Sequence, residues 1–266
     1  MSVVYLLGHP VAHSLSPAMH NAAFRSLGLP HRYETLDVTA DQLPGVVERI
    51  RSGELLGANV TVPHKASVAR LADRLVDDAA KLGVANTLVA AGGMVVGHNT
   101  DALGFEAANR DRGFIVMDRV LVLGAGGAAR AVVLALLRAG NTVFVAARDR
   151  SKCDALIAAV ADEDGSAASA VDWRAIGEPG YDAVVNATPL GLHGEDPLGD
   201  RPLPPLVADI VPLASTPLLR RAKAQGSEVM DGLGMLLYQA AFSFRIWTGL
   251  DAPVEVMRAA LYASVN

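Results

Sequence analysis

The sequence is poor in cysteine and has no long apolar run, and each absence excludes a class of protein. Cys153 is the single cysteine among 266 residues, so neither an internal disulfide nor a zinc site built from CxxC pairs is available. We therefore expect a reducing, cytoplasmic setting. Apolar runs such as Ala131–Leu137 are far shorter than the roughly 20 residues of a membrane span, and the first residues show no basic region or cleavage site of a secretory leader. The sequence predicts neither a membrane protein nor a secreted one.

An excess of one charge is also absent. The chain has 23 Lys and Arg against 28 Asp and Glu, a formal net charge of -5, and both signs are interspersed along its length. Such a balance is a poor match for nucleic acid, which binds basic surfaces. Hydrophobic residues make up 51% of the chain. At about 150 residues per domain, the length corresponds to one large or two ordinary domains, each able to bury a core.

The first hundred residues alternate strand-like and helix-like segments, which is typical of a mainly parallel sheet covered by helices. One helix is predicted to begin at Pro17, with Ser16 as its N-cap, and to end at Gly28. Gly92-Gly93 predicts a hairpin in the last strand. The predicted strands are Val3–Leu7, Tyr33–Val38, Leu55–Val62 and Thr87–Val96, and the further helices are Asp41–Arg51 and Lys65–Ala72.

From Arg119 the pattern changes to an apolar strand, a glycine-rich turn and a helix, as in nucleotide-binding folds. We predict an α/β protein of two domains: a first domain of residues 1–101 and 233–266, and a Rossmann domain of residues 102–232. The strands predicted after residue 119 are Val120–Leu123, Thr142–Ala147, Ala183–Ala187, Val207–Val211 and Glu228–Met230. The predicted helices are Gly127–Ala139, Ser151–Ala161, Pro217–Ala224, Leu233–Thr248 and Val254–Ala263, and the small, polar stretch Asp162–Ala170 is expected to be an exposed loop.

The glycine-rich turn, Gly124-Ala125-Gly126-Gly127-Ala128-Ala129, fits the pattern G-x-G-x-x-G/A. Between a strand and a helix, this pattern lets backbone N–H groups approach a pyrophosphate at the helix N-terminus. An ordinary tight turn is the simpler alternative, but the strand and helix on either side favour a dinucleotide site.

The residues after the next strand bear on which dinucleotide binds. An NAD site would have Asp or Glu about 20 residues after the turn, for the ribose 2′-hydroxyl. Here Arg148 follows Ala147, and a guanidinium suits the 2′-phosphate of NADP. Arg150 and Lys152 add positive charge, whereas the Asp149 carboxylate can accept a ribose hydroxyl. We therefore expect NADP, with NAD as a possible second cofactor.

Polar residues gather in three segments of the first domain, each beside a predicted strand. They are GHPVAHSLSP at 8–17, GANVTVPHK at 57–65, and VANTL to GHNTD across 84–101. Because ligands bind at the carboxyl ends of parallel strands, these segments are expected to face one crevice. Together with GAGGAAR at 124–130, NATPLG at 186–191 and DGLGMLLYQAA at 231–241, they make the sequence closely resemble the shikimate dehydrogenase family, including its quinate-using relatives.

The resemblance implies an NADP-dependent oxidoreductase that reversibly reduces 3-dehydroshikimate to shikimate in chorismate and aromatic amino-acid biosynthesis. Lys65 matches the catalytic lysine that moves a proton on or off the substrate oxygen, and Asp101 matches its carboxylate partner. Ser14 and Ser16 match the pair that binds the substrate carboxylate. The residues that match the family's ligands for the ring hydroxyls are Thr61, Asn86, Asp101 and Gln239. Taken singly, Lys65 fits an exposed lysine equally well and Ser16 fits a helix N-cap. Thr61 and Asn86 fit turn or strand-end residues better than ligands. It is the surrounding motifs that favour a site.

The resemblance also implies a set of cofactor contacts. Gly124, Ala125, Gly126, Gly127 and Ala128 match those to the phosphates, and Ala147, Arg148, Asp149, Arg150 and Lys152 those to the adenosine end. The residues that match contacts on the nicotinamide side are Thr188, Ile210, Gly232 and Met235. Met235 and Gln239 lie four residues apart on one predicted helix face, although core packing is the alternative role for Met235. We expect a small-molecule substrate as the partner, no nucleic acid or membrane, and a monomer or homodimer.

One departure from the family pattern bears on the substrate. Many members carry a tyrosine after the DIV strand, but here Asp209-Ile210-Val211 continues into Pro212-Leu213-Ala214. Three alternatives therefore remain: an NAD-using quinate/shikimate dehydrogenase, a paralogue acting on a related cyclitol carboxylic acid, and a nucleotide-sensing regulator. The spacing of His9, His13 and His20 does not fit metal ligands on one helix face, so we expect no metal.

Overall fold

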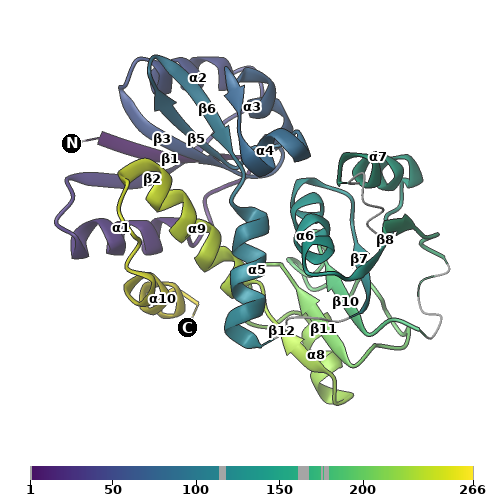
Figure 1. Ribbon diagram of the computed structural model, residues 1–266. Helices are drawn as coiled ribbons and strands as arrows, with labels where there is room; N and C mark the ends of the chain where they lie inside the picture. Colours follow the sequence, from purple (N-terminus) through teal and green to yellow (C-terminus); the bar gives the residue numbers. More distant parts are fainter. Residues whose placement is uncertain (1, 114–117, 161–167, 175, 177–179, 266) are drawn as a thin grey trace. The chain divides into compact units, whose positions relative to one another are not determined.

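The computed structural model describes residues 2–113, 118–160, 168–174, 176 and 180–265, and it divides the chain into two compact units (Figure 1). The first unit comprises residues 1–104 and 237–266, and the second comprises residues 105–236. The chain leaves the first unit inside helix α5 (Asp101–Arg112) and returns to it inside helix α9 (Leu233–Thr248). The boundaries expected from the sequence fall at the start of these two helices.

The first unit contains a mixed sheet of six strands in the order β2-β1-β3-β5-β6-β4. Strand β5 runs antiparallel to β3 and β6, and the other pairs are parallel, so the sheet is mainly parallel, as predicted. The predicted hairpin is also present, with both Gly92 and Gly93 at positive φ between β5 and β6. The strands are β1 (Ser2–Gly8), β2 (His31–Asp37), β3 (Leu55–Val60), β4 (Arg74–Leu75), β5 (Thr87–Ala91) and β6 (Met94–His98).

Helices cover both faces of this sheet (Figure 1). Helices α2 (Leu43–Arg51), α3 (Lys65–Leu71) and α4 (Asp77–Leu82) bury apolar side chains with the strands in one cluster. Helix α1 (Ser16–Ser26) packs against β2 and against α10 (Val254–Ala263).

One detail of α1 differs from the prediction. Ser16 is the first helical residue, and the N-cap position belongs to Leu15, whose side chain makes no capping bond. Instead, the backbone N–H of Ser16 donates to Ser14 Oγ at 3.2 Å. The predicted N-cap role of Ser16 is therefore wrong, because the hydroxyl that accepts near the start of the helix belongs to Ser14.

The second unit contains a fully parallel sheet of six strands in the order β12-β11-β10-β7-β8-β9, as in a doubly wound nucleotide-binding fold. Helix α6 packs against β7 and β8, α7 against β8 and β9, and α8 against β11 and β12. The strands are β7 (Arg119–Leu123), β8 (Thr142–Ala146), β9 (Ala168–Ala170), β10 (Ala183–Asn186), β11 (Leu206–Asp209) and β12 (Glu228–Met230). The helices are α6 (Gly127–Arg138), α7 (Arg150–Val160) and α8 (Pro217–Ala224).

The prediction of a loop over Asp162–Ala170 is wrong for its last three residues. Residues Ala168–Ala170 form β9, which pairs in parallel with β8 and completes that edge of the sheet. Residues 162–167 lie outside the described residues. Three small residues carry little strand signal of their own, so the pairing partner decides this strand.

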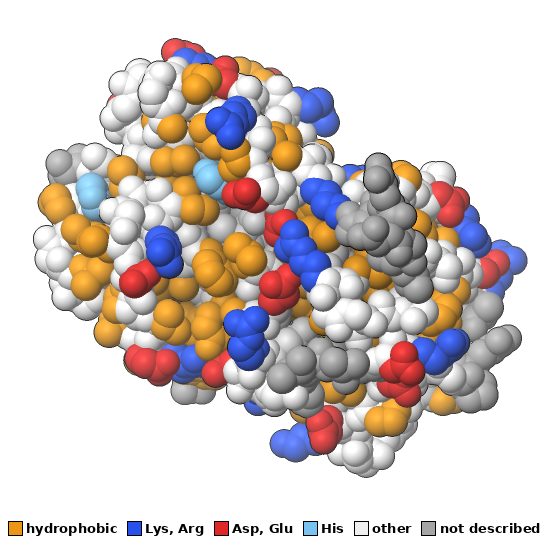
Figure 2. All heavy atoms as spheres, in the orientation of Figure 1, with side chains coloured by type: hydrophobic (Ala, Val, Ile, Leu, Met, Phe, Trp, Pro, Cys, Tyr) orange, Lys and Arg blue, Asp and Glu red, His pale blue; other side chains and the backbone are white. Residues whose placement is uncertain are grey.

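The described helices and surface agree with the composition of the chain. Within the described ranges, no helix has both the length and the apolar character needed to cross a membrane. On the face shown in Figure 2, Lys and Arg side chains lie among Asp and Glu side chains rather than in a separate patch.

His20 lies inside an aromatic cluster of the first unit. Its ring stacks on Tyr33 with centroids 4.3 Å apart and lies 5.3 Å from Trp247 and 6.5 Å from both Phe24 and Phe244. The side chain is 0% exposed, and neither ring nitrogen has a hydrogen-bond partner. Burial lowers the pKa of His20 to about 3, so the imidazole is neutral in the native protein.

This buried imidazole predicts acid sensitivity. Below the ordinary pKa of 6.5 the unfolded chain protonates His20 while the native chain does not, so the free energy of unfolding falls as pH decreases from 6.5 toward about 3. The slope reaches up to about 1.4 kcal/mol per pH unit. We expect His20→Phe to lose this part of the slope in urea denaturation series between about pH 6.5 and 4.5. The exposed His13→Gln control should keep the wild-type slope, and a wild-type slope in His20→Phe would contradict the assignment.

Candidate functional site

An ion pair between Lys65 and Asp101 forms the centre of the polar site in the first unit. Lys65 is the first residue of α3 and Asp101 is the first residue of α5. Lys65 Nζ donates to Asp101 Oδ2, and the two side chains are only 14% and 6% exposed. At such burial each charge depends on the other, because removing one partner leaves an uncompensated charge in the interior. The fold thus brings together the two predicted catalytic residues, 36 positions apart in the chain.

The Asp101 carboxylate has a second fixed partner. Asn86 Nδ2 donates to Asp101 Oδ1 at 2.8 Å and to Thr100 Oγ1 at 2.9 Å. The backbone N–H of Asp101 donates to Asn99 Oδ1 at 3.0 Å, and Asn99 Nδ2 donates to Val84 O at 3.1 Å. Asn86 is 2% exposed and uses both amide hydrogens within the protein, so it can donate to a ligand hydroxyl only by exchanging one of these bonds.

Gln239 lies beside the first turn of α5 because Gly104 has no side chain. A Cβ atom at Gly104 would lie 2.7 Å from Gln239 N and 2.8 Å from its Cβ. Gln239 is half-buried, as is Thr61, whose backbone N–H donates to Leu7 O at 2.8 Å. Met235, the other predicted residue of α9, is 7% exposed and belongs to the second unit.

The two predicted carboxylate-binding serines lie next to each other at the start of α1. Ser14 Oγ accepts the backbone N–H of Ser16, so the hydroxyl hydrogen of Ser14 can be donated to a ligand. Ser16 is 5% exposed. Two hydroxyls beside a helix N-terminus suit an anionic group.

The predicted phosphate-binding turn joins β7 to α6. Gly124 has a φ of +109°, and a Cβ atom there would lie 2.9 Å from Ala187 O, so the turn requires glycine. Gly126 is exposed, and a Cβ atom there would meet nothing within 4 Å, so the backbone is open to a ligand at this point. Helix α6 begins at Gly127, so Gly127 and Ala128 lie in its first turn. These features fit a bound pyrophosphate.

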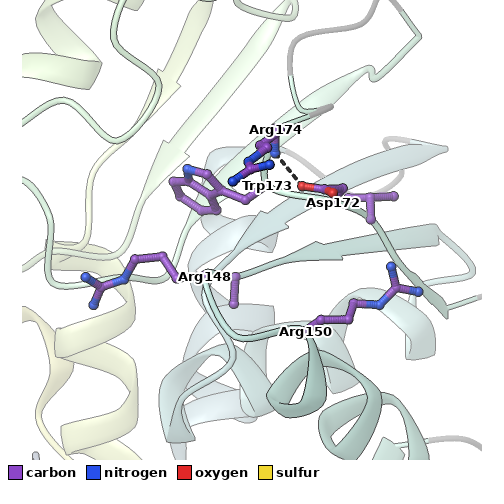
Figure 3. A pocket seen from close by; sticks show the side chains of 7 residues that line it. Arg148, Arg150, Asp172, Trp173 and Arg174 are labelled. Atoms are coloured by element: carbon purple, nitrogen blue, oxygen red, sulfur yellow. Dashed lines mark hydrogen bonds between the residues drawn. The ribbon is translucent and has the colours of Figure 1, made fainter.

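A cavity of about 350 Å³ adjoins the carboxyl ends of β8 and β9 (Figure 3). Arg148 and Arg150 follow β8 and point to opposite sides, while Trp173 and Arg174 approach from the segment after β9. Three guanidinium groups and an indole suit a ligand that is both anionic and aromatic. Ala147, Val171 and Asp172 complete the lining.

The sequence prediction missed Trp173 and Arg174 because it assigned the strand before them to a loop. An aromatic residue next to an arginine, after the third strand of a Rossmann pattern, is the signal that could have found them.

One oxygen of the Asp149 carboxylate is hydrogen-bonded within the protein. Its Oδ1 accepts from Ser151 N at 3.1 Å and from Ser151 Oγ at 2.6 Å, at the start of α7. The hydrogen bond from the Ser151 side chain is the main cause of a lowered pKa for Asp149. Nearby Arg150 pairs with Asp154 at 3.3 Å, and Lys152 is exposed. The exposed cations Arg148 and Lys152 therefore flank an exposed Asp149 carboxylate whose Oδ2 takes no part in these two bonds.

The predicted nicotinamide-side residues follow the last three strands of the second sheet. Thr188 donates through N and Oγ1 to Asn186 Oδ1, at 3.1 and 2.7 Å, and Asn186 Nδ2 donates to Asp209 Oδ1 at 2.9 Å. Burial raises the pKa of Asp209 to about 6, against the lowering effect of the hydrogen bonds that its carboxylate accepts from Thr216 Oγ1, Val211 N and Asn186 Nδ2. Gly232 lies against the backbone that follows β11, because a Cβ atom at Gly232 would lie 2.5 Å from Ile210 O. The sequence prediction included Thr188, Ile210 and Gly232 but not the supporting Asn186 and Asp209.

The histidines take other roles. Within the described part of the chain, no three His, Cys, Asp or Glu side chains gather as metal ligands would. His9 Nδ1 lies 2.5 Å from Asp37 Oδ1, and His20 is enclosed by aromatic rings.

Comparison with known proteins gives consistent matches. Residues 6–88 match the family model of the shikimate dehydrogenase substrate binding domain, and residues 232–262 match that of the shikimate 5′-dehydrogenase C-terminal domain. A shikimate dehydrogenase (NADP(+)) from Desulforamulus reducens is 41% identical, covering 98% of this chain and 94% of the relative.

Solved structures match over the same extent. The shikimate 5-dehydrogenase from Thermus thermophilus, in complex with NADP(H) and shikimate, aligns with a TM-score of 0.89 and 39% identity, covering 99% of this chain and 100% of the other. A quinate dehydrogenase from Corynebacterium glutamicum in complex with NAD aligns with a TM-score of 0.89 and 33% identity, covering 98% and 99%.

The burial of the ion pair predicts an asymmetry in stability. We expect Lys65→Met to lower the free energy of unfolding by about 3 kcal/mol, because the Asp101 charge loses its counterion. Lys65→Met combined with Asp101→Asn should lose less than the single variant, because no buried charge remains. Urea denaturation near neutral pH measures both values. A double variant no more stable than Lys65→Met would mean that the pair is not energetically coupled.

Proposed function

The chain belongs to the shikimate dehydrogenase family, and we propose that it catalyses the reversible reduction of 3-dehydroshikimate to shikimate with NADPH. The buried pair of Lys65 and Asp101 carries the proposal, because reducing a ketone requires a proton donor at the oxygen. NADPH supplies the hydride when it is bound. Lys65 holds, at Nζ, the proton that the substrate oxygen takes up, and Asp101 keeps the ammonium in place. In the oxidative direction, Lys65 receives the proton.

The polar side chains around this pair support a hydroxylated acid as the substrate. Ser14 and Ser16 bind the carboxylate, and Thr61, Asn86 and Gln239 bind ring hydroxyls together with Asp101. Several such groups in one site discriminate against analogues that lack a hydroxyl, because those analogues leave buried polar groups unpaired.

The second unit supports NADP as the cofactor. The turn from Gly124 to Ala128 holds the pyrophosphate, Arg148 binds the 2′-phosphate with help from Arg150, Lys152 and Arg174, and Trp173 packs on the adenine. Asp149 uses only one carboxylate oxygen to accept from Ser151, so it is the guanidinium of Arg148 that favours NADP over NAD. Thr188, Ile210, Gly232 and Met235 line the nicotinamide side.

We assign this reaction to chorismate and aromatic amino-acid biosynthesis in the cytoplasm, carried out by a monomer or homodimer. A second candidate is NAD-dependent quinate oxidation, which is favoured by the similarity to the quinate dehydrogenase complexed with NAD.

One assay tests the proposed function. We expect wild-type kcat/KM to be highest for shikimate with NADP when shikimate and quinate are each measured with NADP and NAD by nicotinamide absorbance. Lys65→Ala should lower kcat by about a hundredfold or more, because the proton donor is lost. The exposed Lys223→Ala serves as the control and should keep wild-type turnover. Wild-type turnover by Lys65→Ala would refute the mechanism, and dominant quinate or NAD activity would select the second candidate.

A matched pair of variants tests the cofactor site. Arg148→Ala should raise KM for NADP about tenfold or more and leave KM for NAD nearly unchanged, because only NADP carries the 2′-phosphate. Trp173→Ala should raise both KM values by a similar factor, since both cofactors contain adenine. Equal effects of Arg148→Ala on the two cofactors would refute the assignment of the 2′-phosphate.

A further inference from the structure

Asp209 is a buried carboxylate at the end of β11, the strand between β10 and β12 in the second sheet. Its Oδ1 accepts from Val211 N at 3.1 Å, and its Oδ2 accepts from Thr216 Oγ1 at 2.7 Å. Residues 212–215, between these two donors, are exposed, whereas Asp209 and Thr216 are each 0% exposed. One carboxylate therefore holds both ends of the surface segment that follows β11.

The same carboxylate holds the turn that follows β10. Asn186 Nδ2 donates to Asp209 Oδ1 at 2.9 Å and to Leu190 O at 2.8 Å. Asn186 Oδ1 accepts from Thr188 N at 3.1 Å and from Thr188 Oγ1 at 2.7 Å. Thr188 Oγ1 accepts in turn from Leu190 N at 3.1 Å. Asn186 is 0% exposed and Thr188 is half-buried, so a buried amide fixes a side chain that reaches the surface.

Each of these side-chain bonds has a defined direction. Leu190 O only accepts and Thr188 N only donates, so the Asn186 amide cannot be reversed. Its two amide hydrogens meet two acceptors, and its oxygen meets two donors from Thr188. The Thr216 hydroxyl accepts from Leu219 N at 3.3 Å, which leaves its single hydrogen for Asp209.

Gly232 approaches the backbone after β11 from the side of β12. A Cβ atom at Gly232 would lie 2.5 Å from Ile210 O and 2.4 Å from Val211 O, so only glycine allows this approach. Ile210 is half-buried. The Ile210–Val211 backbone is thus fixed by the Asp209 carboxylate and by close packing against Gly232.

We propose that Asp209 is a positioning residue for the nicotinamide end of the cofactor. This inference rests on the proposed function, which places Thr188 and Ile210 at that end. Thr188 lies in the turn that is tied to Asp209 through Asn186, and Ile210 lies between Asp209 and Val211, whose N–H the carboxylate accepts. Contact residues that are locked by a layer of buried hydrogen bonds hold a ligand in one geometry.

The adenosine end is assigned to different strand ends. Its cavity, lined by Arg148 and Trp173 among others, follows β8 and β9, which lie on the other side of β7 in the strand order. Loosening the segments after β10 and β11 should therefore release the nicotinamide and leave the hold on the phosphorylated adenosine unchanged. General support of the sheet would affect both ends.

Turnover and the binding of a cofactor fragment distinguish these two roles. The fragment is ADP-ribose 2′-phosphate, which is NADP without its nicotinamide. We expect Asp209→Ala to lower kcat for shikimate oxidation with NADP about tenfold or more, because hydride transfer depends on the orientation of the nicotinamide. Calorimetric Kd for the fragment should change less than about twofold. Asp209→Asn retains an oxygen that can accept from Asn186 and Val211, and should recover most of the lost kcat. An unchanged kcat in Asp209→Ala, a rise in its Kd for the fragment that matches the fall in kcat, or no recovery in Asp209→Asn would overturn the proposal.

The fluorescence of bound NADPH tests the same point without turnover. The reduced nicotinamide is the fluorescent group, so a ring that is held less firmly decays faster. At saturating NADPH and without substrate, we expect the fluorescence lifetime in Asp209→Ala to shorten toward that of the free cofactor, and that in Asp209→Asn to stay close to wild type. A wild-type lifetime in Asp209→Ala would overturn the proposal.

A second position covers the case in which Asp209→Ala does not fold. Thr216→Val removes the donor to Asp209 Oδ2 and should lower kcat about threefold or more, whereas Thr216→Ser retains the hydroxyl and should keep kcat near wild type. Ser227→Ala removes a hydroxyl that donates to Pro204 O before β12, at the opposite end of that strand, and should keep wild-type kcat. Equal kcat values for the two Thr216 variants would overturn the proposal. A wild-type protein inactive with shikimate and either cofactor would instead refute the proposed function, so the wild-type measurement separates the two failures.

Discussion

The negative charge of Asp101 must be stabilised without water, since its side chain is only 6% exposed. An ionised carboxylate at this depth is stable only where the protein supplies a counterion and hydrogen-bond donors. Lys65 and Asn86 meet that requirement from two different segments, and Asn99 fixes the backbone of Asp101. The loops after β3, before β5 and after β6 therefore converge on one point. The same ion pair serves stability and chemistry, because the ammonium group that neutralises the buried charge is also the proton donor.

The second unit relies on a different physical device. Its parallel strands all end at one edge, where backbone N–H groups at the start of α6 and the guanidinium groups after β8 and β9 face outward. Asp149 adds a negative charge at the start of α7, where one of its oxygens accepts from Ser151. The guanidinium groups that line the cavity are what suits this edge of the sheet to a phosphorylated dinucleotide.

Much of the fold follows from local pattern. The elements Pro217–Ala224, Glu228–Met230, Leu233–Thr248 and Val254–Ala263 have the predicted bounds, because apolar periodicity together with proline and glycine at the ends sets such limits. The predictions miss helix α5 (Asp101–Arg112), which spans 12 residues where only a domain boundary was expected, and several shorter elements. Helix α4, strand β4 and strand β9 have too few residues to show a period, and β9 exists because β8 offers it a partner. Ser16 departs from its expected cap role because α1 begins at Ser16 itself, and the hydroxyl that accepts near its start belongs to Ser14.

The sequence by itself determined most of the elements, the nucleotide-binding turn, the resemblance to the family and the identity of Lys65 and Asp101 as a candidate pair. These features depend on residues that are close together in the chain or on short sequence motifs. Only the tertiary structure decided which polar groups share bonds. Asn59 and Ser243, separated by 184 positions, lie 3.0 Å apart, and Trp173 lies across the cavity from Arg148. Hydrogen bonding acts over a few ångströms of space, and a linear pattern does not specify which distant side chains packing will bring within that range.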